Sequence, residues 1–317
     1  MALNKPMQLA LKLLSPDIDM KKVYKLHRRA LSLKEPHVLR FFYEMWDHKV
    51  LNGDREVLVR LYPPGEEKRS GLLLFFHGGG WVVENINTYN RVCLNLARHM
   101  GCRVASVEYS LAPETPFPGG LEDCYAVARE ILHHPELFGL STQEITLIGD
   151  SAGGNLAAAL SLLARDRGEF TIPRQILLYP AVYDDHNEAT SPFDSVRENG
   201  EGYLLTSRRI DDYMSLYLPD PAQRKNPYVA PLYAPDLSRQ PNTLLITAEY
   251  DPLRDEGEAY AEALRKAGNQ VTSYRMPDAL HGFFSFDPHL PHVKKAYELI
   301  EAFLDGALPG KEEPHCQ

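Results

Sequence analysis

The sequence is poor in cysteine and contains no long apolar run. Its four cysteines, Cys93, Cys102, Cys124 and Cys316, form no C-x-x-C pair among 317 residues. This low density excludes a disulfide-stapled scaffold, and we expect free thiols in a reducing compartment. No segment approaches the roughly 18 consecutive apolar residues of a membrane-spanning helix, so we expect no membrane span.

Positive charge is also scarce, with 34 Lys and Arg against 43 Asp and Glu and a formal net charge of −9. A chain with this balance is not drawn to phosphate backbones or anionic lipids, so we expect neither nucleic acid nor a membrane as a partner. Lys5, Pro6 and Lys12 interrupt the apolar residues at the N-terminus, which predicts no signal peptide and a cytoplasmic protein. The twelve histidines include no i, i+4 pair with a nearby carboxylate, and no metal site is predicted.

What the sequence does contain is an alternation of strand-like and helix-like segments. Strands are predicted at 56–62, 72–76, 103–109, 145–148, 175–179, 243–247 and 271–275. Helices are predicted at 88–100, 121–133, 152–164, 256–267 and 293–304. This order predicts an α/β fold with a mostly parallel, doubly wound sheet, in which ligands bind at the carboxyl ends of the strands.

Breaks in the alternation divide the chain. Residues 49–182 and 225–308 are predicted to form the core. Residues 183–224 lie between two predicted strands and are too long for a normal crossover, so they are predicted to be a cap insertion. Residues 1–48, with helical spacing around 38–46, are predicted to be N-terminal cap helices. Residues 309–317 are predicted to be a disordered tail.

The motif G-D-S-A-G at residues 149–153 lies between a β-branched run and a run of small residues and leucine. Glycine on both sides of Ser151 lets strand turn into helix almost without a loop. Such a turn strains the central residue and exposes its side chain, as a nucleophile requires. The start of the helix adds N–H donors and a positive dipole end, which suit a developing oxyanion.

A serine nucleophile needs a base, and the base needs an orienting acid. Asp251 directly follows a predicted strand, and His281 lies in a loop past the next one. Asp251 is preferred to Asp255, which is better placed to begin the following helix. His77 is the rival base, but its position before three glycines is more typical of a residue that braces their loop. The order Ser, Asp, His is that of the α/β-hydrolase triad.

A second glycine-rich loop, Gly78, Gly79 and Gly80, follows His77 at the end of an apolar strand-like run. Glycines there let the backbone approach a bound group closely. The amides of Gly78 and Gly79, with that of Ala152, are predicted to converge on the oxygen that becomes negative in an acyl-transfer transition state.

Five motifs in register resemble the hormone-sensitive-lipase-like family of carboxylesterases, which includes bacterial acetyl esterases. They are H-G-G-G at 77–80, Y-S-L-A-P-E at 109–114, G-D-S-A-G-G-N at 149–155, D-P-L-R-D-E at 251–256 and H-G-F at 281–283. The resemblance implies an α/β-hydrolase fold with a helical cap. It implies roles for Ser151 as nucleophile, Asp251 as acid, His281 as base, and Gly78, Gly79 and Ala152 as oxyanion donors. It also implies hydrolysis of short-chain acyl esters without a cofactor.

The pocket is predicted from bulky residues near these motifs. Trp81 and Phe283 flank the glycines and the base, and Tyr203 of the insertion is predicted to roof the alcohol side, so all three are expected to bind substrate. One residue departs from the family pattern: Glu84 stands where the family often has a further glycine, and we expect it to alter the path of the loop.

A closed apolar pocket of this kind predicts a small-molecule ester as the partner, with an acyl group from acetyl to about hexanoyl. An amidase, a thioesterase or a carbamate hydrolase would use the same triad, and these alternatives remain open. A non-enzymatic small-molecule receptor is a further alternative, against which the complete serine turn and His281 argue. A homo-oligomer is also left open.

Overall fold

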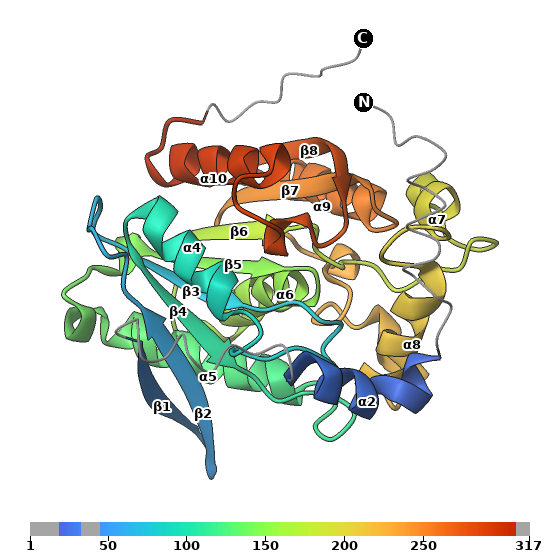
Figure 1. The fold of residues 1–317 in the computed structure, drawn as a ribbon, viewed down its shortest axis with the longest axis horizontal. Helices are drawn as coiled ribbons and strands as arrows, with labels where there is room; N and C mark the ends of the chain where they lie inside the picture. The colour runs from blue at the N-terminus through green and yellow to red at the C-terminus, as the bar shows by residue number, and fades with distance from the viewer. Residues whose placement is uncertain (1–18, 33–44, 309–317) are drawn as a thin grey trace.

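The computed structural model describes residues 19–32 and 45–308, which centre on one twisted sheet (Figure 1). The sheet has eight strands in the order β1-β2-β4-β3-β5-β6-β7-β8. Strand β2 is antiparallel to β1 and β4, and the other neighbours are parallel. The strands are β1 (Trp46–Asn52), β2 (Arg55–Tyr62), β3 (Leu72–Phe76), β4 (Arg103–Glu108), β5 (Ile145–Asp150), β6 (Arg174–Leu178), β7 (Asn242–Tyr250) and β8 (Val271–Leu280). The predicted α/β-hydrolase fold is therefore confirmed.

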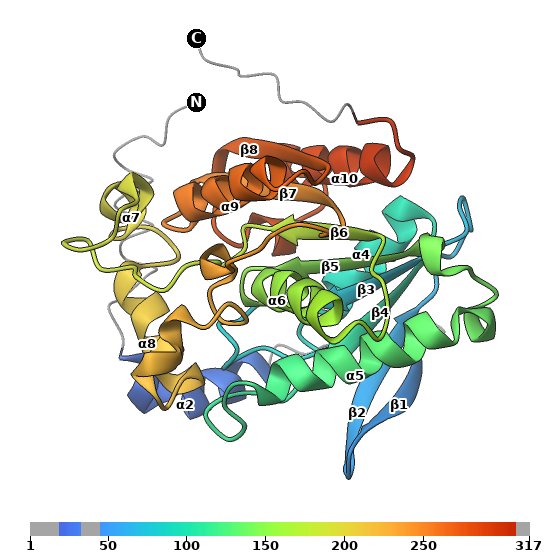
Figure 2. The same cartoon turned by 180° about the vertical axis from the view of Figure 1, so that it is seen from behind.

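Helices cover both faces of the sheet. Helices α4 (Asn90–Met100) and α10 (Pro291–Leu304) lie on the face seen in Figure 1. Helices α5 (Gly119–His133), α6 (Ala152–Arg167) and α9 (Arg254–Lys266) cover the opposite face (Figure 2). Short 3-10 turns complete the connections, at Pro135–Phe138, Thr142–Glu144, Pro221–Lys225, Pro231–Tyr233 and Phe283–Ser285.

Strand β3 shows why the central strands are so apolar. All five of its side chains are buried, because it lies between two other strands with helices above and below. Leu72, Leu74 and Phe76 pack into the core that includes α5 and α6, whereas Leu73 and Phe75 pack into the core that includes α4 and α10. A continuous apolar run is what a strand buried on both faces requires.

Three helices lie outside the sheet, beyond the carboxyl ends of its parallel strands. They are α2 (Met20–Ser32), α7 (Asp194–Asn199) and α8 (Ser207–Tyr217), and α2 and α8 lie side by side (Figure 1). The backbone N–H of Met20 donates to Asp212 Oδ2 at 2.9 Å. Arg28 donates to the carbonyl oxygens of Val82 and Ala112, which joins α2 to the glycine loop and to the loop after β4.

The predicted boundary at residue 48 is wrong by a few residues. Strand β1 begins at Trp46, so residues 46–48 belong to the sheet and not to a cap helix. The sequence shows little sign of this strand, since it is an edge strand and most of its side chains are exposed. The rest of the predicted helical stretch around 38–46 and the predicted tail 309–317 lie outside the described residues, as does Cys316.

Cys93, Cys102 and Cys124 are free thiols and are buried. No helix among the described residues has the length and apolar character that crossing a membrane would require.

The tight junction of β5 and α6 makes a stability prediction. A Cβ added to Gly153 would overlap the carbonyl oxygens of Phe76 and His77. Gly153→Ala is therefore expected to lower the free energy of unfolding by about 1–3 kcal/mol through overpacking, although alanine alone would favour the helix by about 1 kcal/mol. Chemical denaturation followed by circular dichroism measures the change.

Gly71→Ala is the matched control, because its Cβ would meet its nearest neighbours at ordinary distances of 3.4 and 3.7 Å. This variant is expected to stay within about 0.5 kcal/mol of wild type. Equal stability of Gly153→Ala and wild type would show that the junction is looser than the structure indicates.

Candidate active site

Ser151 occupies a strained turn between β5 and α6. Its φ is 55° and its ψ is −118°, and its backbone N–H donates to the carbonyl oxygen of Leu178 at 2.9 Å. A non-glycine residue rarely adopts a positive φ, and such strain persists only where the surroundings impose it. Here Gly149 and Gly153 pack backbone to backbone, which forces the turn and leaves the Ser151 side chain in the cavity.

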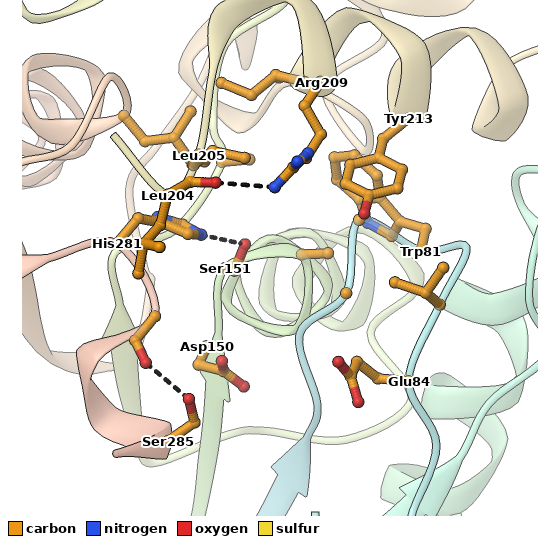
Figure 3. A pocket seen from close by; sticks show the side chains of 18 of the residues that line it. Trp81, Glu84, Asp150, Ser151, Leu204, Leu205, Arg209, Tyr213, His281 and Ser285 are labelled. Carbon is orange, nitrogen blue, oxygen red and sulfur yellow. Dashed lines mark hydrogen bonds between the residues drawn. The ribbon is translucent and has the colours of Figure 1, made fainter. Parts of the chain in front are cut away.

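The structure brings Ser151, His281 and Asp251 together. Nε2 of His281 lies 2.9 Å from Ser151 Oγ, and its Nδ1 lies 2.7 Å from Asp251 Oδ2 (Figure 3 shows the first contact). The carboxylate is fully buried, so it favours a proton on Nδ1 and leaves Nε2 to accept the serine proton. Asp251 is itself held by the backbone N–H of Leu253, which donates to Oδ1 at 2.9 Å.

Asp255, the alternative acid, faces the cap insertion. Its Oδ2 accepts from the backbone N–H of Ser195 at 2.7 Å, and its Oδ1 accepts from Arg254 Nε at 2.7 Å. Asp255 thus supports the start of α7 and makes no contact with His281 among the hydrogen bonds of the described residues.

His77, the alternative base, is buried beneath the glycine loop. Its Nδ1–H donates to the carbonyl oxygen of Gly78 at 2.7 Å, and its own carbonyl oxygen accepts from the Tyr109 hydroxyl at 2.7 Å. The two rings stack at 4.3 Å. Burial lowers the pKa of His77 to about 4, so the ring is neutral at physiological pH. This placement braces the loop, as the sequence predicted.

The amide of Gly78, which was predicted to donate to the oxyanion, has acceptors within the protein. The backbone N–H of Gly78 lies 2.9 Å from Asp150 Oδ1 and 3.2 Å from the Tyr89 hydroxyl oxygen, so its donor is already engaged within the protein. Gly79 and Gly80, with φ values of 108° and 60°, line the cavity instead. The sequence analysis chose Gly78 and not Gly80 because the acceptor of the Gly78 amide, Asp150, belongs to a different strand, β5.

The cavity at Ser151 has a volume of about 230 Å³. One wall is the glycine loop with Trp81, whose ring stacks on Tyr217 at 4.6 Å. The cap insertion, including α8, also lines the cavity, with Leu204, Leu205, Arg209, Ile210 and Tyr213. Figure 3 shows Leu204, Leu205, Arg209 and Tyr213, the last of them beside Trp81. The sequence predicted that the insertion covers the site, but it did not assign Leu205, Arg209, Ile210 or Tyr213, which the tertiary structure places in the lining.

Two of the predicted substrate-binding residues are not part of this lining. Phe283 is 1% exposed and packs edge-on against Tyr179 at 5.3 Å in the core behind His281. Tyr203 stacks on Tyr250 at 5.6 Å, whereas its neighbour Leu204 lines the cavity. Trp81 is the one of the three that does line it.

Glu84 keeps the backbone conformation that a glycine would have. Its φ is 68°, in the left-handed region that side chains other than glycine rarely adopt. The residue places a carboxylate in the lining of the cavity (Figure 3).

No group of three or more His, Cys, Asp and Glu side chains within residues 19–32 and 45–308 is arranged to hold a metal ion. What the site does offer is a serine, an imidazole and a carboxylate in line, beside glycine amides and the first turn of a helix. This arrangement defines the reaction class of an α/β hydrolase with a serine nucleophile.

Comparison with known proteins supports the same class. A family model described as the alpha/beta hydrolase fold matches residues 73–285. An arylesterase of Saccharolobus solfataricus is 37% identical over 241 residues, which are 76% of this chain and 77% of that protein. An acetyl esterase of Salmonella typhi is 32% identical over 237 residues, 73% and 70% of the two chains.

Solved structures are similar over almost the whole chain. A hyperthermophilic esterase from the archaeon Pyrobaculum calidifontis superposes with a TM-score of 0.83 at 35% identity, covering 96% of this chain and 99% of that one. The chain belongs to the hormone-sensitive-lipase-like family of α/β hydrolases, as its five motifs predicted.

The choice between the two aspartates gives a prediction. Asp251→Asn is expected to lower kcat about 10⁴-fold, because the imidazole loses the acceptor that sets its tautomer. Asp255→Asn is expected to keep kcat within about tenfold of wild type. Steady-state hydrolysis of an activated ester by the two purified variants measures both; the reverse pattern would place the acid at Asp255.

Proposed function

We propose that this protein is a serine carboxylesterase that hydrolyses short-chain acyl esters, from acetyl to about hexanoyl, through an acyl-enzyme intermediate. The observation that carries the proposal is the hydrogen-bonded line from Asp251 through His281 to Ser151 at one small cavity. It is a carboxylic ester hydrolase, the class in which relatives spanning most of its length are named.

In the first step, Ser151 Oγ attacks the carbonyl carbon of the ester while Nε2 of His281 takes the hydroxyl proton. Asp251 stabilises the imidazolium that forms. The tetrahedral intermediate then collapses, the bond to the alcohol oxygen breaks, and His281 gives its proton to the leaving alcohol. The acyl group stays on Ser151.

In the second step, water attacks the acyl carbon, and His281 takes a proton from it. Collapse of the second tetrahedral intermediate breaks the bond to Ser151 Oγ, which recovers its proton from His281. The carboxylic acid leaves, and the enzyme returns to its starting state without any cofactor.

The negative oxygen of both intermediates needs donors, and we assign them to Gly79, Gly80 and Ala152. The two glycines line the cavity, and the Ala152 amide begins α6, where it has no acceptor within the helix and lies at the positive end of the dipole. Gly78 is excluded because its amide donates to Asp150. Each donor is worth about 2.7–4 kcal/mol of barrier.

The size of the cavity supports a short acyl group. Its volume of about 230 Å³ lies below the roughly 300–1,000 Å³ of sites for drug-sized ligands. Trp81 and Tyr213 are held by their surroundings: Trp81 stacks on Tyr217, and Tyr213 packs directly against Gly80. We therefore expect the walls to resist long chains.

The role of Ser151 is tested by Ser151→Ala. This change is expected to leave the fold intact and to lower kcat about 10⁴-fold or more, since no nucleophile remains. Hydrolysis of p-nitrophenyl butyrate measures activity, and a fluorophosphonate probe should label wild type stoichiometrically and the variant not at all. A tenth of wild-type activity in the pure variant would end the proposal.

Substrate size is tested by a chain-length series of p-nitrophenyl esters. Each methylene that fits should gain roughly 0.8 kcal/mol, and each that does not should cost about 1–3 kcal/mol. Activity is expected to peak between about two and six acyl carbons and to collapse beyond about ten. A maximum at twelve or more carbons would refute the small pocket, and faster turnover of matched amides or thioesters would move the protein to those classes.

A further inference from the structure

Asp150, the last residue of β5, precedes the nucleophile and is 3% exposed. Its carboxylate has two partners from other parts of the chain. Oδ1 accepts from the backbone N–H of Gly78 at 2.9 Å, and Oδ2 accepts from the hydroxyl of Tyr89 at 2.9 Å. Figure 3 shows Asp150 directly beneath Ser151. One carboxylate thus joins β5, the glycine loop and the residue before α4.

The Asp150 carboxylate packs closely against the backbone of Gly78. A Cβ on Gly78 would lie 2.8 Å from Asp150 Oδ2 and 2.9 Å from the Tyr89 hydroxyl oxygen, so only glycine fits. On the other side, the carbonyl oxygen of Gly78 accepts from His77. Both peptide groups of Gly78 are therefore fixed, and the next two residues, Gly79 and Gly80, line the cavity.

Burial disfavours the ionised form of the Asp150 carboxylate. Burial raises the pKa of Asp150 to about 6, although the hydrogen bond from Tyr89 opposes that rise. A group whose charge is disfavoured by its surroundings, yet which meets two donors from elsewhere, acts as a fixed point between segments. Asp150 directly precedes Ser151, and consecutive Cα atoms are about 3.8 Å apart. A segment that is hydrogen-bonded to Asp150 is therefore also held close to Ser151.

We propose that Asp150 is a positioning residue of the hydrolytic reaction, whose carboxylate holds the amides of Gly79 and Gly80 at a set distance from Ser151 Oγ. This inference rests on the proposed function and deepens it at the same site. A shift of about 1 Å in such a group lowers the rate about 100-fold. The donors that Asp150 positions stabilise the transition state, where the carbonyl oxygen of the ester becomes negative, and hardly stabilise the bound substrate.

Three variants test this at pH 8. Asp150→Ala removes both acceptors and is expected to lower kcat about 100-fold with KM within about threefold of wild type. Asp150→Asn keeps an acceptor for Gly78 and offers an amide that donates to the Tyr89 oxygen, so kcat should recover to within about tenfold. Tyr89→Phe removes one of the two donors and should lie between them.

A short-chain trifluoromethyl ketone separates positioning from general damage to the fold. It forms a hemiketal with Ser151 whose oxygen carries the charge of the transition state. Its Ki is expected to rise in Asp150→Ala by the factor by which kcat/KM falls. Asp123→Ala is the control: Asp123 is also buried and joins separate segments, accepting from the amide of Ser110 and from the side chains of Asn52 and Arg55, but the hydrogen bonds of its carboxylate do not reach the glycine loop. Its kcat should stay within about threefold of wild type.

Any one of three results would overturn the proposal. These are an Asp150→Ala enzyme with kcat within threefold of wild type, an equal loss in the Asp123 control, and a kcat loss with no change in Ki. If Asp150→Ala does not fold, Asp150→Asn and Tyr89→Phe decide by the same kcat and Ki readouts. The rate of fluorophosphonate labelling of Ser151 needs no knowledge of the substrate, so the inference stays testable even if wild type hydrolyses none of the esters.

Discussion

The site depends on one close approach, that of the serine turn to the glycine loop. Strands β3 and β5 are parallel neighbours, and Phe76 at the end of β3 lies opposite Gly149, one residue before the end of β5. The first turn of α6 therefore presses against the loop that leaves β3, with room for no side chain at Gly153. Ser151 is strained, and the glycine loop is near it, for the same reason: two adjacent strands end together, and the segments that follow them share a space that only backbone can fill.

Buried carboxylates then fix what surrounds this contact. Asp251 orients His281, and Asp150 holds the glycine loop. Glu256, fully buried on α9, accepts from the backbone N–H groups of Val182 and Tyr183 at 2.7 and 3.1 Å, which anchors the insertion at its root. Each charge is compensated by hydrogen bonds, the condition under which a protein tolerates a buried charge. The D-P-L-R-D-E motif thus serves both the candidate acid and the attachment of the cap.

Predictions from the sequence held wherever the signal was local. The strands at 72–76, 145–148 and 243–247 lie where their apolar runs predicted them, since a strand buried on both faces must be largely apolar. The predictions failed where a residue's partner came from a distant part of the chain. Gly78 was assigned to the oxyanion, but its amide goes to Asp150, 72 residues away. Phe283 was assigned to the pocket, but Tyr179 encloses it in the core. Neither partner leaves a trace in the residues next to these positions.

By itself, the sequence determined the family, the α/β order of the elements and the triad of Ser151, Asp251 and His281 as candidates, because glycines and polar residues at strand ends are required by backbone geometry and by chemistry. The tertiary structure alone decided which glycines line the cavity, which residues of the insertion line it and which segments each buried carboxylate joins. The direction of a hydrogen-bond donor depends on the position of its acceptor. Whether a side chain lines the cavity or lies in the core depends on which residues pack against it. Both are set by contacts between segments that the chain brings together only when it folds.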